Sequence, residues 1–88
     1  PLEVTLNNAY PNPFNPTTTL SYVVPTDMNV TLAIYDMRGR LVDELVNNMH
    51  ERGQHHVTWN ADQLSSGIYM VKLITGSTVN VQKVMLIK

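Results

Sequence analysis

"VTLAIYDMRGRLV", residues 30–42, is the stretch that decides the fold of this chain. Apolar side chains recur at every second position from Val30 to Ile34, so they share one face if the segment is a β-strand. The run ends at "DMRG", where Asp36 and Gly39 fit the first and fourth positions of a type I turn whose glycine takes a positive φ. The sequence therefore predicts a strand that enters a β-hairpin.

The return arm of this hairpin fits two structures. Its apolar residues would line one stripe of a helix; they are Leu41, Val42, Leu45, Val46 and Met49. The same residues could instead form a bulged strand that returns from the turn. The turn chemistry before the segment and the β-type pattern around it favour the strand.

Outside this hairpin, short apolar segments alternate with turn signals about every ten residues, which is typical of a β-sandwich or barrel. Alternation of Leu2, Val4 and Leu6 with polar residues predicts a first short strand. The remaining strands are expected at residues 19–24, 30–36, 41–49, 55–59, 67–74 and 78–87. Seven segments predict an all-β fold, a seven-stranded antiparallel immunoglobulin-like β-sandwich. It forms one domain over residues 1–88, with residues 1–9 as a linker or first strand.

Side-chain positions within these strands predict the core. Lys72 marks the outward face of its strand, so the odd-numbered residues from Tyr69 to Leu73 point inward. Tyr69 could be a core aromatic or could brace the backbone through its hydroxyl group. Trp59, the single tryptophan, is the expected plug between the two sheets.

The last strand carries an irregular pattern. Val79 and Val81 share one phase of the alternation, whereas Val84 and Leu86 take the opposite phase. A change of phase moves the apolar side chains to the other face of a strand. The pattern therefore predicts a bulge or a bend at residues 82–83.

The stretch "YPNPFNP", residues 10–16, places Phe14 among three prolines. Each proline fixes φ and removes an amide donor, and each asparagine before a proline is pushed into an extended conformation. We expect a stiff segment that holds Phe14 against the sandwich while the chain crosses from one sheet edge to the other. The prolines also protect an edge from pairing with a neighbour.

Composition excludes several classes of function. Charged residues make up 15% of the chain and the formal net charge is −1, so no basic field exists for nucleic acid. The chain has no cysteine, which excludes disulfides and thiolate metal sites. No apolar run approaches the roughly 20 residues that a membrane-spanning helix needs. Because the chain begins with Pro1 rather than methionine, we expect it to be the tail of a longer protein.

The histidines are the only clustered candidates for metal binding. His55 and His56 are neighbours on a predicted strand, so their side chains point to opposite faces. His50 would need a favourable hairpin to join either of them. Surface histidines are therefore the favoured interpretation, and we expect no metal site and no cofactor.

The acidic residues do not predict a catalytic site. Asp36 is explained as a turn former, and no pair among the remaining inner acids has a sequence reason to be buried together. Asn60 and Asp62 could hold a calcium ion with nearby carbonyls, but an Asx turn at Asn60 is the favoured interpretation. The chain is thus expected to be a binding, sorting or spacer module rather than an enzyme.

Several motifs in combination resemble a known family. "YPNPFNPTTTLSY", "VTLAIYDMRGRLV", "SSGIYMVKL" and a terminal "VQKVMLIK" together resemble the type A C-terminal sorting domain of proteins exported by the type IX secretion system. They are also similar to the related immunoglobulin-like domain of flagellar hook-capping proteins. The matching positions are Pro11, Asn12, Pro13, Phe14, Gly39, Gly53, Gly67, Tyr69, Lys83, Val84, Leu86 and Lys88.

This resemblance implies a non-catalytic export signal at the C-terminus of a larger secreted or surface protein. Such domains fold in the periplasm, are recognised by the outer-membrane translocon and are usually removed by a sortase-like peptidase. Recognition is expected at the terminal strand, through Lys83, Val84, Leu86 and Lys88. The remaining motif positions, together with Trp59, are expected to be structural.

Two alternatives stay open. The chain could be a structural module of a flagellar hook cap or cell-surface assembly, or it could be a carbohydrate-binding module. Carbohydrate-binding modules usually display a row of exposed aromatic side chains, whereas Trp59 and Phe14 are expected to be buried here. If the last strand lies at a sheet edge, its free backbone groups could dock onto a partner sheet or form a strand-swapped homodimer.

Overall fold

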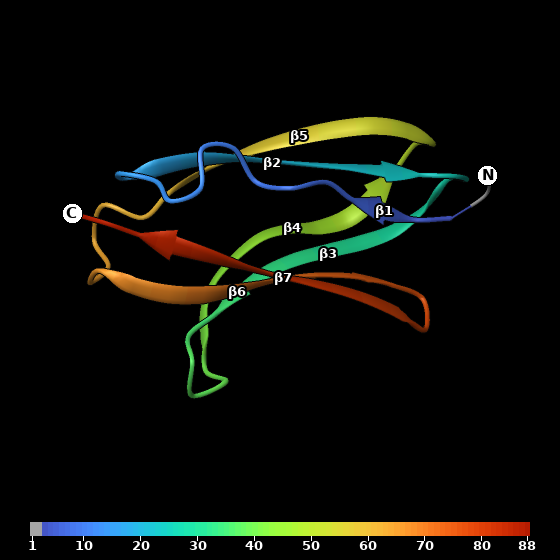
Figure 1. The fold of residues 1–88 in the computed structure, drawn as a ribbon. Coiled ribbons are helices and arrows are strands. Elements are labelled where there is room, and N and C mark those ends of the chain that lie inside the picture. The colour runs from blue at the N-terminus through green and yellow to red at the C-terminus, as the bar shows by residue number, and fades with distance from the viewer. Residues whose placement is uncertain (1–2) are drawn as a thin grey trace.

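Two antiparallel sheets face each other in the computed structural model, which describes residues 3–88 (Figure 1). The described strands are β1 (Thr5–Leu6), β2 (Thr17–Val24), β3 (Met28–Tyr35), β4 (Leu41–His50), β5 (Gly53–Asn60), β6 (Gly67–Thr75) and β7 (Thr78–Leu86). One sheet has the order β1-β2-β5 and the other β4-β3-β6-β7. The predicted seven-stranded antiparallel sandwich is therefore confirmed. Leu2 of the predicted first strand lies outside the described residues.

The β3–β4 hairpin forms as its turn chemistry predicts. Gly39 has a φ of 86°, and its amide donates to the carbonyl of Asp36 at 3.0 Å. The return arm is strand β4 and not a helix, because its backbone pairs with β3 along its whole length. Two register shifts, beside Ala33 and beside Tyr35, show that this pairing is bulged. A bulge explains why the apolar pattern of β4 resembled a helical stripe.

Aromatic side chains fill the space between the two sheets. Trp59 from β5 is 1% exposed, and its ring centroid lies 5.4 Å from that of Phe14 and 5.9 Å from that of Tyr69. The indole nitrogen donates to Oδ2 of Asp43 at 3.1 Å, so its polar edge is satisfied. The predicted role of Trp59 as the plug between the sheets is confirmed. Truncation of such a buried aromatic costs about 3–5 kcal/mol.

The bulge predicted at residues 82–83 was wrong. Strand β7 pairs with β6 in one continuous register, from Gly67 opposite Leu86 to Thr75 opposite Thr78. The alternation is maintained because the polar residues Asn80 and Gln82 take the inward phase, while Val79 and Val81 are 55% and 47% exposed.

Gln82 explains how the inward phase tolerates a polar residue. Its Oε1 accepts from the amide of Ala9 at 2.9 Å, and its Nε2 donates to the carbonyl of Asn7 at 2.6 Å. These bonds to the backbone satisfy the side-chain amide in a partly buried place, which a count of apolar residues could not reveal.

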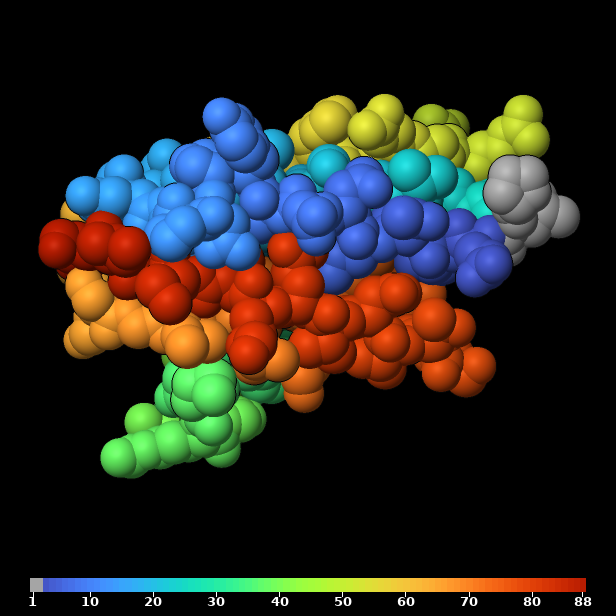
Figure 2. All heavy atoms as spheres, viewed as in Figure 1, coloured from blue at the N-terminus to red at the C-terminus, as the bar shows by residue number. Residues whose placement is uncertain are grey.

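Residues 7–16, named here the crossing segment, connect the edges of the two sheets (Figure 1). Tyr10 forms an antiparallel bridge with Thr19 of β2, and Phe14 forms a parallel bridge with Leu86 of β7. Figure 2 shows the segment, in blue, lying against the C-terminal strand, in red. Phe14 is 2% exposed, so the predicted crossing with a buried phenylalanine is confirmed. The peptide bonds before Pro11, Pro13 and Pro16 are cis.

Candidate functional site

The C-terminal half of β7 meets the crossing segment at the edge of the four-stranded sheet. The amide of Phe14 donates to the carbonyl of Met85 at 2.9 Å, and the amide of Ile87 donates to the carbonyl of Phe14 at 2.9 Å. Phe14 thus forms an isolated parallel bridge at the edge of β7. The backbone bends at residues 11–13 and 15–16 on either side of Phe14, so the extended conformation expected for this stretch is wrong and the pairing is confined to Phe14.

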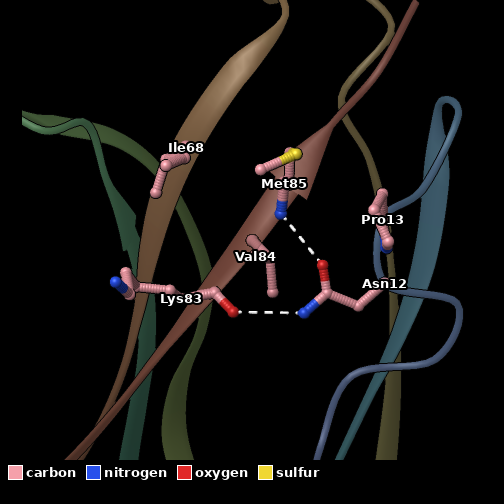
Figure 3. A pocket seen from close by; sticks show the side chains of 6 residues that line it. All are labelled: Asn12, Pro13, Ile68, Lys83, Val84 and Met85. Carbon is pink, nitrogen blue, oxygen red and sulfur yellow. Dashed lines mark hydrogen bonds between the residues drawn. The ribbon is translucent and has the colours of Figure 1, made fainter.

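Asn12 extends this pairing with its side chain (Figure 3). Its Nδ2 donates to the carbonyl of Lys83 at 3.2 Å, and its Oδ1 accepts from the amide of Met85 at 3.0 Å. The carboxamide therefore reproduces the donor and acceptor of a neighbouring strand. Four edge groups of β7, the Lys83 carbonyl, the Met85 amide and carbonyl and the Ile87 amide, are bonded within the chain and are therefore occupied for the strand addition expected at this end of β7.

A surface groove of about 310 Å³ lies beside these contacts (Figure 3). Its lining residues, which define what we call the Asn12–Met85 groove, are Asn12, Pro13, Ile68, Lys83, Val84 and Met85. Met85 is 41% exposed, and Ile87 just beyond the groove is 49% exposed. The groove offers apolar side chains, one carboxamide and one lysine.

The four residues expected to serve recognition take different positions. Val84 and Leu86 are each 1% exposed and belong to the core between the sheets. Lys83 is exposed and borders the groove. Because alternate residues of a strand point to opposite faces, burial of Val84 and Leu86 turns Lys83 and Met85 outward.

Lys88 instead holds the end of the chain to the loop between β5 and β6. Its Nζ donates to the carbonyls of Asp62 at 2.6 Å and Leu64 at 3.0 Å. Its backbone amide donates to Oγ of Ser66 at 3.0 Å. These bonds attach Lys88 to the β5–β6 loop, two residues after Leu86, which pairs with Phe14.

Sequence reasoning missed the outward apolar residues of the groove, Met85 and Ile68. They lie opposite each other in the β6–β7 pairing and therefore share one face of the sheet. The signal was available in the sequence, since strict alternation from the buried Leu86 places Met85 outward.

Several of the remaining motif positions make contacts within the fold or lie at strand starts. The hydroxyl of Tyr69 donates to the carbonyl of Ser65 at 2.6 Å while its ring is 8% exposed, so both predicted roles of this tyrosine hold. Gly53 and Gly67 begin β5 and β6 with φ values of 127° and 154°. Pro11 accepts a bond through its carbonyl from Oγ1 of the buried Thr18 at 2.7 Å, which fixes the start of the proline stretch.

Two of the three histidines, His50 and His55, lie close together. The link between β4 and β5 brings the rings of His50 and His55 to a centroid distance of 4.2 Å, and Nε2 of His50 lies 2.8 Å from the hydroxyl of Tyr22. Burial, and then the charge of His55, lower the pKa of His50. Burial raises the pKa of Tyr22. Among residues 3–88, no group of three or more histidine, cysteine, aspartate or glutamate side chains could hold a metal ion.

Asn60 forms the predicted Asx turn, because its Oδ1 accepts from the amide of Asp62 at 2.9 Å. Residues 3–88 contain no helix of the length and hydropathy that crossing a membrane requires.

Comparison with known proteins identifies the family. A search of the curated proteins finds no match. The family model described as "Secretion system C-terminal sorting domain" matches residues 8–88, which includes the crossing segment from its second residue and all of β7. This match extends over nearly the whole chain. The chain therefore belongs to the family of C-terminal sorting domains of type IX secretion.

Proposed function

We propose that this domain directs a larger secreted or cell-surface protein, of which it is the C-terminal part, through the type IX secretion system. It has no catalytic activity of its own in this proposal. Its partners are the outer-membrane translocon, a sortase-like peptidase and the cargo domain of the same chain. The route runs through the periplasm to the cell surface or the exterior.

The observation that carries this proposal is the pairing of Asn12 with Lys83 and Met85. The two ends of the family motif, separated by about 70 residues, meet in one exposed groove. A sorting signal shared by different cargoes needs a surface that exists only when the domain is folded. The Asn12–Met85 groove meets this requirement because it is built from both ends of the domain.

We assign recognition to the outward side chains of the groove, Lys83 and Met85, rather than to Val84 and Leu86. Methionine is enriched in protein interfaces, and charged side chains such as that of Lys83 are common at their polar rim. Val84 and Leu86 act indirectly, since their burial sets the orientation of the two recognition residues.

The experiment is a reporter fusion in a bacterium that has the type IX machinery. Residues 1–88 are fused behind a periplasmic reporter, and Met85→Lys is compared with Met37→Lys. Both methionines are exposed, at 41% and 63%, but Met37 lies in the β3–β4 turn. We expect Met85→Lys to reduce secretion several-fold and Met37→Lys to leave it unchanged.

Trp59 fluorescence of each purified variant reports whether the core remains folded. Periplasmic retention of the unmodified fusion would contradict the sorting function itself. Equal secretion of the unmodified and Met85→Lys fusions, with both folded, would contradict only the assignment of the groove.

A further inference from the structure

A second pocket, of about 320 Å³, lies at the other end of β7 from the Asn12–Met85 groove. It is formed by the start of the described chain, the connection between β2 and β3 and both sides of the β6–β7 turn. Its lining residues, which define what we call the Thr75–Asn80 pocket, are Glu3, Val4, Pro25, Met28, Thr75, Thr78 and Asn80. No residue of the groove lines it, so the two sites are distinct.

Two buried polar groups in this pocket have no hydrogen-bond partner among the described residues. They are Oγ1 of Thr75, a residue that is 3% exposed, and Nδ2 of Asn80. Burial of a hydroxyl or amide group without a hydrogen-bond partner is unfavourable, and such groups are usually paired in folded proteins. Both residues line the same pocket, and each of these groups can donate to an acceptor oxygen.

The neighbouring residue Gln82 shows what an amide side chain of β7 binds. Gln82 lies two residues after Asn80 and therefore on the same face of the strand. It donates to a backbone carbonyl, that of Asn7, and accepts from the amide of Ala9. Its partner is thus the backbone of an extended segment that runs beside the strand.

We propose that the Thr75–Asn80 pocket binds a backbone carbonyl of an extended peptide. Nδ2 of Asn80 and the hydroxyl of Thr75 donate to the carbonyl oxygen. Val4, Pro25 and Met28 provide an apolar wall for a small side chain of that peptide. Glu3 at the pocket disfavours an anionic ligand, which makes an uncharged carbonyl a better fit than a carboxylate.

The test is a titration of the isotope-labelled 88-residue chain with N-methylacetamide, the smallest peptide unit, followed by NMR. We expect saturable shifts of the amide signals of Thr75, Thr78 and Asn80, and none at Met85 in the groove. Glucose, which offers hydroxyl oxygens and no carbonyl, serves as the second probe and is expected to give no saturable shift.

The Thr75→Val variant tests whether the hydroxyl group of Thr75 binds a ligand or stabilises the fold. Valine matches threonine in shape and favours a strand, but it removes the hydroxyl. We expect affinity for N-methylacetamide to fall about tenfold, the size of one lost hydrogen bond. The melting temperature should stay constant or rise, because an unpartnered buried hydroxyl is removed. Thr58→Val, at an exposed position of β5, is the matched control and should change neither quantity.

Three results would overturn the proposal. One is the absence of saturable shifts with N-methylacetamide, and another is a response to glucose that equals the response to N-methylacetamide. The third is a lower melting temperature of Thr75→Val with unchanged affinity, which would assign the hydroxyl to an internal water. None of these measurements involves secretion, so their outcome is independent of the proposed sorting function.

Discussion

The crossing segment and the β3–β4 turn are both irregular stretches between strands, but they are stabilised over different distances along the chain. In the turn, Asp36 accepts from the amides of Arg38 and Arg40, two and four residues away. In the crossing segment, side-chain bonds of Asn12 and contacts to Gln82 join residues 71 to 75 positions apart. The turn therefore supports one hairpin, whereas the crossing segment joins the beginning of the domain to its end.

This difference shows that a proline-rich stretch can be a structural element and not a linker. Prolines cannot form a complete ladder, but here they lie in bends between two backbone bridges, one to β2 and one to β7. Here Phe14 enters the core, and Asn12 completes the edge of β7. Damage to the crossing segment should lower the stability of the whole domain, whereas damage to the turn should remain local.

The largest effect is expected for Phe14→Ala. Phe14 is 2% exposed and packs against Trp59, so truncation should lower the free energy of unfolding by about 3–5 kcal/mol. Urea denaturation followed by Trp59 fluorescence measures this change. Tyr10→Ala, in the same segment but 81% exposed, is the control and should cost less than about 0.5 kcal/mol. If the two substitutions lowered the free energy of unfolding equally, the structural role that we assign to the buried Phe14 would be contradicted.

Gln82→Ala should have the next largest effect. It leaves the amide of Ala9 and the carbonyl of Asn7 without their partner, and Ala9 is only 5% exposed. We expect a loss of about 1–3 kcal/mol in the free energy of unfolding. Gln54→Ala, at an exposed position of β5, is the control and should leave the free energy of unfolding nearly unchanged. A neutral Gln82→Ala would mean that water replaces the side-chain amide without cost.

Asn12→Ala should cost less, about 1 kcal/mol, because its two bonds lie at the surface where water can replace them. Hydrogen exchange of the Met85 amide should nevertheless become faster, since its acceptor is lost. Asn8→Ala is the matched control, because Asn8 is an exposed asparagine of the same segment. Unchanged exchange at Met85 would show that Asn12 does not protect the edge of β7.

The sequence predicted the parts of this fold that depend on near neighbours. The hairpin at Asp36 and Gly39, the inward face of β6 and the plug formed by Trp59 all follow from spacing over a few residues. Turn chemistry and strand alternation act over such distances and can be recognised in a single sequence.

The missed features depend on contacts between distant residues. The bulge predicted in β7 was wrong because the inward Gln82 is satisfied by the backbone near Ala9, which the local pattern cannot show. The groove was also missed as a unit, although its residues were partly named. Resemblance to a family indicated Asn12 and Lys83 separately, and only the fold brings them together.

The smallest effect is expected at the turn, where Asp36 provides a pH-dependent contact. The pKa of Asp36 is lowered from the ordinary carboxyl value of 3.8, chiefly because the Arg40 amide donates to its carboxylate. Bonds from the Arg38 amide and the Arg40 guanidinium act in the same direction. For a group with a lowered folded-state pKa, the stabilisation is present above pH 3.8 and is lost as the pH falls through the folded-state pKa.

NMR titration of the Asp36 carboxyl group should therefore give a midpoint below 3.8. Exchange of the Arg38 and Arg40 amides should accelerate below that midpoint, while Trp59 fluorescence continues to report a folded core. Asp36→Ala should produce the same fast exchange at neutral pH, whereas Asp36→Asn keeps an acceptor oxygen and should largely preserve protection. A midpoint at or above 3.8, or unfolding of the core in Asp36→Ala at neutral pH, would show that this turn is not the local element that its short-range bonds indicate.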